Sequence, residues 1–193
     1  MPKSRINILH FILVLVIAIA VALIVRVYFI EPTLVRGASM SPTLHDQDRL
    51  LISKKSEPER FDVVVFHTSD NHSLVKRVIG LPGEKVEYKD DTLYIDGEPY
   101  EEPYLESNKD AITDNGPLTN TFQLEDTELG NTTVPEGQLF VMGDNRRLSK
   151  DSRQIGTIPL EDVVGVSKLI FFPFDDFQWM NGDGYQSKVA NTH

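Results

Sequence analysis

The sequence predicts a mainly β protein, in which an N-terminal transmembrane helix precedes an antiparallel β domain with an inserted acidic subregion. An uninterrupted apolar segment, long enough to cross a bilayer, begins at residue 8. After it, short runs of branched and aromatic residues alternate with turn-forming residues, which is typical of antiparallel strands. No stretch beyond the apolar segment repeats apolar residues at the helical period over three turns.

The apolar segment, residues 8–30, predicts the membrane anchor. Its first part, Ile8 to Val25, carries no formal charge. As a helix the whole segment spans roughly 34 Å, and the hydrocarbon core of a bilayer is about 30 Å thick. A cleaved signal peptide is the alternative, because small residues alternate in "AIAVA" (18–22). The apolar run is longer than the usual signal-peptide core, which favours the uncleaved anchor.

The orientation follows from the basic residues Lys3 and Arg5, which precede the anchor. By the positive-inside rule, residues 1–7 stay in the cytoplasm and residues 31–193 form an extracytoplasmic domain. We therefore expect a single-pass protein of the cell membrane, with the lipid bilayer as a partner. The aromatic stretch 169–179 is a further candidate for lipid contact, with a core strand followed by surface aromatics as the alternative.

Runs rich in β-branched and aromatic residues predict the strands of the domain. We expect strands at 48–54, 61–67, 73–80, 138–142 and 163–174, and a hairpin within 85–100. The hairpin turns are expected at Asp90-Asp91 and Asp96-Gly97, which are residue pairs that favour tight turns. Short helical pieces are expected at 149–154 and 159–163.

Acidic residues are concentrated in one part of the chain. Fifteen of the 29 Asp and Glu residues, but only three of the 19 Lys and Arg residues, lie between residues 84 and 136. This surface would repel phosphates, which argues against a nucleic-acid partner. Within it, residues 104–135 are polar and turn-rich, and we interpret them as an insertion or a loosely ordered flap on the β domain.

The composition also limits the chemistry. The chain has no cysteine, which excludes a disulfide framework, a thiol nucleophile and a thiolate metal site. His45, His67 and His72 form no HxH or HExxH pattern, so we expect no metal and no other cofactor. A Ser-His-Asp triad would have to use one of these histidines, and no GxSxG motif supports it.

If histidine is not the base for a serine nucleophile, lysine is the next candidate, provided that burial lowers its pKa from about 10.4. In "SLVKRVIG" (73–80), Leu74, Lys76 and Val78 would lie on one face of a strand and Arg77 on the other. The alternative is an edge-strand lysine that blocks aggregation or reaches water. The charged run "GDNRRLSKDSR" (143–153), taken alone, is typical of a solvated turn.

Several motifs in a set order resemble those of the type I signal peptidases of bacteria. They are "SMSPTL", "RFDVVVF", "KRVIGLPGE", "LYIDGE" and "GDNRRLSKDSR", which follow the anchor in this sequence. The resemblance covers nearly the whole chain, and the single anchor and small size resemble the Gram-positive type. It implies a membrane-anchored serine endopeptidase that removes signal peptides from exported preproteins after small residues (A-x-A), through an acyl-enzyme.

The resemblance also implies roles for individual residues. Ser39 matches the nucleophile, Lys76 the general base, and Ser149 the serine whose hydroxyl orients the lysine amine. The residues implied to shape the site around them are Asp144, Asp151, Arg153, Met40, Pro42, Arg77 and Gly37.

Two positions depart from the family pattern. Gly37 stands where some relatives have a serine that helps to hold the oxyanion, so the Ser39 N–H and a donor near Gly37 would serve. Phe61 stands where the family usually has glycine.

An extended substrate would add as a strand beside residues 33–38 and 74–76. Its small side chains would enter shallow pockets lined by Val63, Val65 and Leu74. Two other functions stay open from the sequence. One is a Ser-Lys self-cleaving protein of the related β fold, and the other is a non-catalytic, membrane-tethered β domain that binds partners through its acidic insert. The sequence does not predict the oligomeric state.

Overall fold

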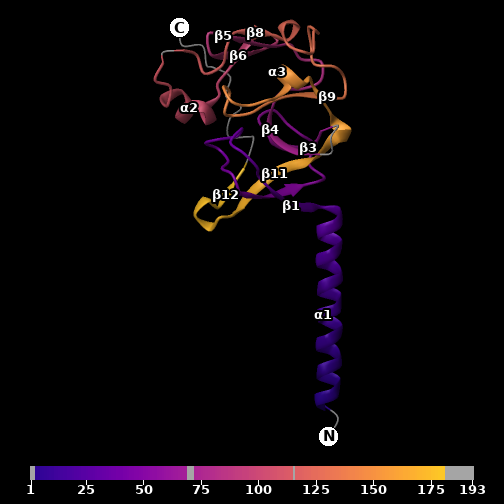
Figure 1. Ribbon diagram of the computed structural model, residues 1–193. Coiled ribbons are helices and arrows are strands. Elements are labelled where there is room, and N and C mark those ends of the chain that lie inside the picture. The colour runs from indigo at the N-terminus through magenta and orange to yellow at the C-terminus, as the bar shows by residue number, and fades with distance from the viewer. Residues whose placement is uncertain (1–2, 69–71, 115, 181–193) are drawn as a thin grey trace.

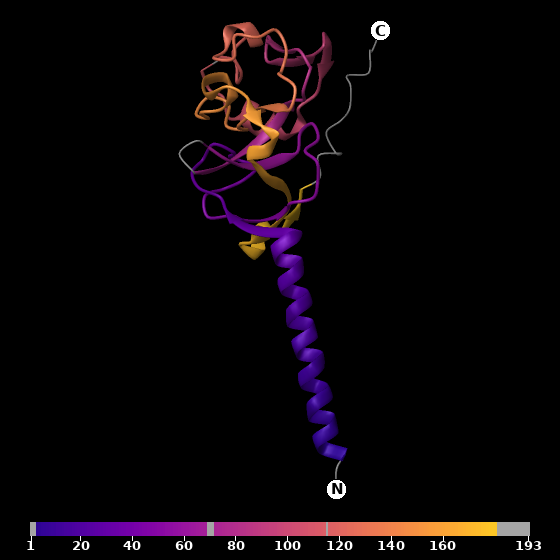
Figure 2. The same ribbon diagram turned by 90° about the vertical axis from the view of Figure 1, so that its right-hand side faces the viewer.

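The computed structural model describes residues 3–68, 72–114 and 116–180, with side chains from residue 8 onward. One long helix, α1 (Lys3–Tyr28), projects from a β domain made of two sheets (Figures 1 and 2). Within it, Ile8–Tyr28 is long and apolar enough to cross a membrane, and none of its most apolar window is buried against the domain. The helix ends two residues before the predicted limit because Ile30 already pairs with Ser53. Residues 1–2 of the predicted cytoplasmic segment and residues 181–193 of the predicted domain lie outside the described residues.

The larger sheet has eight strands, and all of their pairings are antiparallel. Its order is β1 (Ile30–Leu34), β2 (Arg49–Ser53), β11 (Val163–Phe172), β3 (Val63–His67), β4 (Ser73–Gly80), β9 (Gln138–Met142) and β10 (Ile158–Pro159), while β12 (Gln178–Trp179) pairs with β11. The predicted antiparallel β architecture is therefore confirmed. β4 and β9 have the bounds that the sequence predicts, and β2, β3 and β11 are shorter than expected.

The smaller sheet contains the predicted hairpin. Its order is β7 (Glu98–Tyr100), β6 (Thr92–Ile95), β5 (Val86–Lys89) and β8 (Phe122–Gln123). Asp90, Asp91, Asp96 and Gly97 have φ angles of 48°, 62°, 52° and 84°. Tight hairpin turns need such left-handed residues, and Asp and Gly adopt them at lower cost than most residues. Both predicted turns are confirmed.

Short helices join the strands. They are η1 (Pro103–Leu105), α2 (Glu106–Asp110), η2 (Leu124–Asp126), α3 (Ser152–Ile155), η3 (Leu160–Asp162) and η4 (Phe174–Asp176). The helix predicted at 149–154 begins only at Ser152, because the Asp151 carboxylate caps it by accepting the Arg153 N–H.

The segment 104–135 is folded against the smaller sheet and is not a loose flap. Leu105, Leu118, Leu124 and Val134 are buried in one apolar cluster with residues of β5, β6 and β9. β8, which lies inside this segment, pairs with β5. The isolated apolar residues of the segment have no regular period, so their shared burial is not visible in the sequence.

Phe61 shows why glycine is usual at its position. Its φ angle is 68°, in the left-handed region that strains a side-chain-bearing residue by about 1 kcal/mol or more. The ring is fully buried and packs against Tyr100 and Tyr104, with centroids 6.3 Å and 5.7 Å away. Burying such a ring contributes about 2–3 kcal/mol, which offsets the strain and keeps the start of β3 in place.

Candidate active site

Ser39 and Lys76 are brought together from different parts of the chain. Ser39 lies in the loop between β1 and β2, and Lys76 lies in the middle of β4. The Lys76 Nζ atom is 2.7 Å from the Ser39 Oγ atom, within hydrogen-bond distance. This contact has the geometry of a nucleophile beside its base.

The Lys76 side chain is 2% exposed, so the alternative of a lysine that reaches water is wrong. It lies opposite Val64 on β3 and on the same strand face as Leu74 and Val78. Burial of the amine lowers the pKa of Lys76, because the cation loses hydration, while the charges of Asp151 and Asp144 act in the opposite direction. A lowered pKa favours the neutral amine, which is the form that can accept a proton.

Gly143 brings the Ser39 loop against the loop that follows β9. A Cβ atom at Gly143 would collide with the Ser39 carbonyl oxygen and with the Ser149 Oγ atom. The Ser39 carbonyl also accepts the Asn145 N–H at 3.1 Å. The absence of a side chain at Gly143 is therefore what allows the close approach.

Ser149 is buried, but its Oγ atom has no hydrogen-bond partner among the described residues. The hydrogen bond to the lysine amine that the resemblance implies is therefore not formed in this structure. The backbone of Ser149 is held by the Asn145 carbonyl, which accepts its N–H at 2.8 Å. The hydroxyl remains an unused polar group beside Gly143.

Arg77 lies on the opposite face of β4 and forms a buried, bidentate ion pair with Asp144. Arg77 Nε donates to one carboxylate oxygen at 2.8 Å and Nη2 donates to the other at 2.6 Å. Its Nη1 donates to the Phe61 carbonyl, and its guanidinium lies 3.9 Å from the centre of the Tyr104 ring. The pair ties the loop after β9 to the strand that carries Lys76.

Asp151 holds the other end of that loop. Its carboxylate accepts the Gly143 N–H at 3.0 Å and two hydrogen bonds from the Arg153 guanidinium, both at 2.8 Å. Arg153 also donates to the Arg146 carbonyl at 2.8 Å. Asp144, Asp151 and Arg153, which the resemblance implies to shape the site, therefore all take part in ion pairs.

Arg146 belongs to a buried network that the sequence reasoning missed. Its Nη2 donates to Glu102 Oε1 at 2.5 Å, and its Nη1 donates to the Tyr88 hydroxyl at 2.6 Å. Tyr104 also donates to Glu102 at 2.5 Å, and burial raises the pKa of both tyrosines, so their hydroxyls stay protonated. No local signal distinguishes Arg146 from the neighbouring Arg147, which is exposed.

The Gly37 N–H donates to the Asp46 carboxylate at 2.7 Å, so it is not free to hold an oxyanion in this structure. Gly37 has a φ angle of 82°, a conformation that favours glycine. By contrast, the Ser39 N–H makes no hydrogen bond with any residue that the structure describes. That N–H is the available backbone donor beside Ser39 Oγ.

A cleft opens beside Ser39 and Lys76. Of the predicted pocket residues, only Leu74 lines it, together with Ala38, Leu148 and Ile158. Val63 and Val65 are 2% and 1% exposed and pack in the core, so their predicted role as pocket residues is wrong. In the antiparallel register Val65 lies opposite Val75, while Lys76 lies opposite Val64, so the predicted pair is on the other face of β3.

The same cleft is also lined by His67 and His72, two of the histidines that form no metal-binding pattern in the sequence. Both are exposed, and His67 Nδ1 lies 3.3 Å from the Ser73 hydroxyl. His67 is the last residue of β3 and His72 directly precedes β4, so both lie at the rim of the cleft and not in the contact between Ser39 and Lys76.

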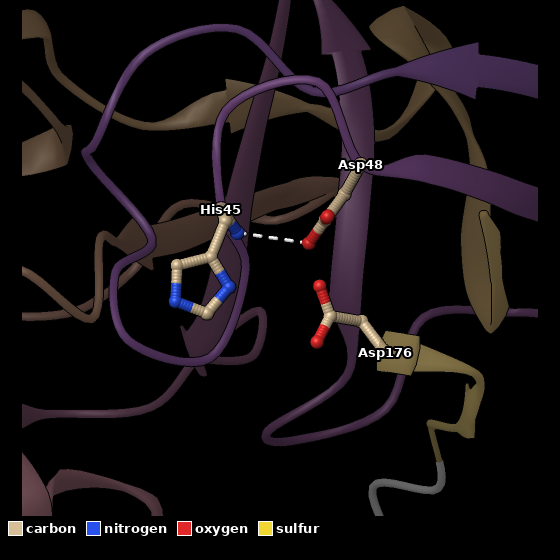
Figure 3. Close-up of side chains that lie close together, drawn as sticks. All are labelled: His45, Asp48 and Asp176. Carbon is tan, nitrogen blue, oxygen red and sulfur yellow. Dashed lines mark hydrogen bonds between the residues drawn. The ribbon is translucent and has the colours of Figure 1, made fainter. Parts of the chain in front are cut away.

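One group among the described residues could hold a metal ion, namely His45, Asp48 and Asp176 (Figure 3). Their ligand atoms lie within 4.8 Å of one another. Asp48 is buried and accepts the His45 N–H at 2.8 Å, whereas His45 and Asp176 are exposed. They line a hollow that shares no residue with the cleft of Ser39 and Lys76.

Comparison with known proteins found a matching family and similar chains. The family model "Signal peptidase, peptidase S26" matches residues 8–172. A signal peptidase I of Bacillus amyloliquefaciens is 48% identical over 172 residues, which cover 85% of each chain. A signal peptidase IB of Staphylococcus aureus (strain COL) is 41% identical over 180 residues, 89% of this chain and 93% of that protein.

A crystal structure of a signal peptidase I from Enterococcus faecalis V583 is similar at a TM-score of 0.55 and 48% identity. The similarity covers 57% of this chain and 97% of that one.

Proposed function

This chain belongs to the peptidase S26 family and is a serine peptidase that removes signal peptides from preproteins; we propose that Ser39 is its nucleophile and Lys76 its general base. The observation that carries the proposal is the 2.7 Å contact between Lys76 Nζ and Ser39 Oγ. The lysine in that contact is almost fully buried and its pKa is lowered. No other described pairing of a hydroxyl with a base meets in a cleft with this geometry.

The proposed reaction proceeds through an acyl-enzyme. Ser39 Oγ attacks the carbonyl carbon of the scissile bond while the neutral Lys76 amine takes the hydroxyl proton. The resulting ammonium gives that proton to the leaving amine as the C–N bond breaks. Lys76, neutral again, then takes a proton from the water that attacks the ester carbon, and it returns that proton to Ser39 Oγ as the ester C–O bond breaks.

The oxyanion of each tetrahedral intermediate is stabilised by the Ser39 N–H. This donor is free among the described residues, whereas the Gly37 N–H is bound to Asp46. A preorganised donor of this kind contributes about 3–4 kcal/mol to the transition state. A second donor comes from water or from a movement of the Gly37 loop when substrate binds.

The substrate lies in the cleft as an extended peptide with small residues before the scissile bond. β4 pairs with β9 only from Arg77 onward, so the backbone of Leu74 to Lys76 has an edge that no described strand occupies. β1 is an edge strand that pairs only with β2. A peptide that pairs with these two edges would place its carbonyl carbon beside Ser39, and alternate side chains would face Leu74 and Ala38.

The anchor holds this site at the membrane surface, with the domain on the extracytoplasmic face and residues 1–7 in the cytoplasm. The domain end of α1 and the segment with η4 and β12 lie on the same side of the domain (Figures 1 and 2). That segment exposes Phe174, Phe177 and Trp179 at 80%, 54% and 65%. Aromatic side chains of this kind favour the bilayer interface, which supports contact of this end with lipid.

The test is cleavage of a purified preprotein by the full-length protein in detergent, followed by sequencing of the new N-terminus. Ser39→Ala and Lys76→Ala are each expected to abolish processing, and Lys55→Ala, an exposed lysine outside the cleft, is expected to process at the wild-type rate. Processing at the wild-type rate by either single variant of the pair would contradict the assignment. Cleavage after residues that are not small would contradict the proposed specificity.

A further inference from the structure

We propose that Asn108 is a positioning residue that aligns Ser39 with Lys76, and that this is a function of the segment 104–135. The inference rests on the proposed function of Ser39. Asn108 lies in α2 and belongs to neither of the loops that form the site. Its side-chain Nδ2 atom donates to the Ser41 carbonyl at 3.2 Å and to the Asp144 carbonyl at 2.7 Å.

These two acceptors make Asn108 a bridge. Ser41 is two residues from the nucleophile, and Asp144 is the partner of Arg77 on the strand of Lys76. Since one amide nitrogen has two N–H groups, Asn108 uses both of them on these backbone carbonyls. The bridge therefore sets the separation between the Ser39 loop and the loop tied to β4.

The helix that carries Asn108 is attached to the core of the smaller sheet. α2 directly follows η1, in which Tyr104 and Leu105 are buried in the core of the smaller sheet. The Tyr104 hydroxyl donates to Glu102, which is also the partner of Arg146. Asn108 is half-buried between the Ser39 loop and the loop after β9. Because α2 is fixed to the core through η1, the Asn108 side chain can hold both loops in place.

Asn145 makes a second connection to the Ser39 loop, and comparison with it shows which constraint comes from Asn108 alone. Its side chain donates to the Ala38 carbonyl at 3.1 Å, and its backbone N–H donates to the Ser39 carbonyl at 3.1 Å. Asn145 moves with its own loop, so it joins the two loops to each other. Asn108 attaches both of them to the smaller sheet, and the nucleophile then has one position relative to Lys76.

The experiment compares Asn108→Ala, Asn108→Asp and a control, Ser107→Ala, in the full-length protein with a preprotein substrate. Ser107 is exposed on the same short helix, and the described residues give its side chain no hydrogen bond. For Asn108→Ala we expect kcat to fall on the order of 10- to 100-fold, because a misplacement of about 1 Å has that effect, while KM changes by less than about threefold. Asn108→Asp is expected to lose at least as much, because a carboxylate donates no hydrogen bond and would face two carbonyl oxygens. Ser107→Ala is expected to retain both constants.

The pH profile and thermal unfolding separate positioning from a purely structural role. Asn108 does not contact Lys76, so the rising limb of the pH–rate profile is expected to stay in place while its plateau drops. If Asn108 had a purely structural role, Asn108→Ala would lower the melting temperature, and its kcat per folded molecule would return to the wild-type value at lower temperature. That return would overturn the proposal. A kcat of Asn108→Ala within about threefold of wild type would overturn it as well. If instead Ser39→Ala retains cleavage, the assignment of Ser39 as the nucleophile is wrong. Failure of the proposed function can therefore be distinguished from failure of the proposed role of Asn108.

Discussion

Substitution of Gly143 by alanine tests how closely the two loops of the site must approach. The added Cβ atom would collide with the Ser39 carbonyl oxygen and the Ser149 hydroxyl. Gly143 cannot move away easily, because its N–H donates to Asp151 at 3.0 Å and its carbonyl accepts from Arg146 at 3.1 Å. The displacement therefore falls on the Ser39 loop and on the Ser149 side chain.

The expected loss of cleavage rate follows from the size of that displacement. To reach an ordinary contact, the Ser39 carbonyl has to shift by about 1 Å, and a misplacement of that size reduces a rate by roughly 100-fold. That reduction corresponds to about 2.7 kcal/mol in the activation free energy. Overpacking is expected to lower the free energy of unfolding by about 1–3 kcal/mol as well, which leaves the protein folded at low temperature.

The assay is single-turnover cleavage of a preprotein at a temperature where both proteins are folded. Gly137→Ala is the matched control, because Gly137 has a φ angle of 72° and nothing within 4 Å of an added Cβ atom. We expect the control to lose about 1 kcal/mol of stability through backbone strain and to keep its cleavage rate. If Gly143→Ala cleaves within about threefold of wild type, the close approach of the two loops does not position Ser39.

Four further predictions concern titration and buried contacts. The value of kcat/KM is expected to rise with pH as the Lys76 amine loses its proton, and Lys76→Arg, which stays protonated, is expected to show no such rise. Because the folded-state pKa of Lys76 is below its unfolded value, the unfolded chain binds more protons between the two values, and stability rises with pH across that window. Lys76→Met is therefore expected to flatten this rise in urea titrations at several pH values and to stabilise the protein near neutrality, and an unchanged slope would contradict the burial of the amine. Arg146→Met leaves the Glu102 carboxylate buried without its cation, and urea unfolding is expected to show a loss of about 3–5 kcal/mol, part of which Glu102→Gln restores in the double variant. Phe61→Gly relieves the left-handed strain but loses the ring, so thermal unfolding is expected to show a net loss of about 2–4 kcal/mol, and a gain in stability would show that strain outweighs packing.

Local patterns were sufficient for the elements whose signals lie within a few residues. The apolar run predicts α1, and β4 has the predicted bounds, Ser73–Gly80. The turns at Asp90-Asp91 and Asp96-Gly97 follow from residues that tolerate positive φ angles. The pocket prediction was wrong for Val63 and Val65, because every residue from Val63 to Phe66 is apolar and buried. Such a run has no alternation, so it does not show which face lies beside Lys76.

The residues of the candidate site were predicted from the sequence by resemblance of motifs, and the strand pattern around Lys76 correctly indicated an apolar face. The contacts were decided by the tertiary structure alone: Lys76 with Ser39, 37 residues away, Arg77 with Asp144, and Arg146 with Glu102. The spacing of apolar residues along a chain indicates which side chains face the core and which face solvent, because each side chain is buried or exposed according to its own polarity. Which distant partner a buried charge meets depends on strand register and loop closure, and these are properties of the whole fold.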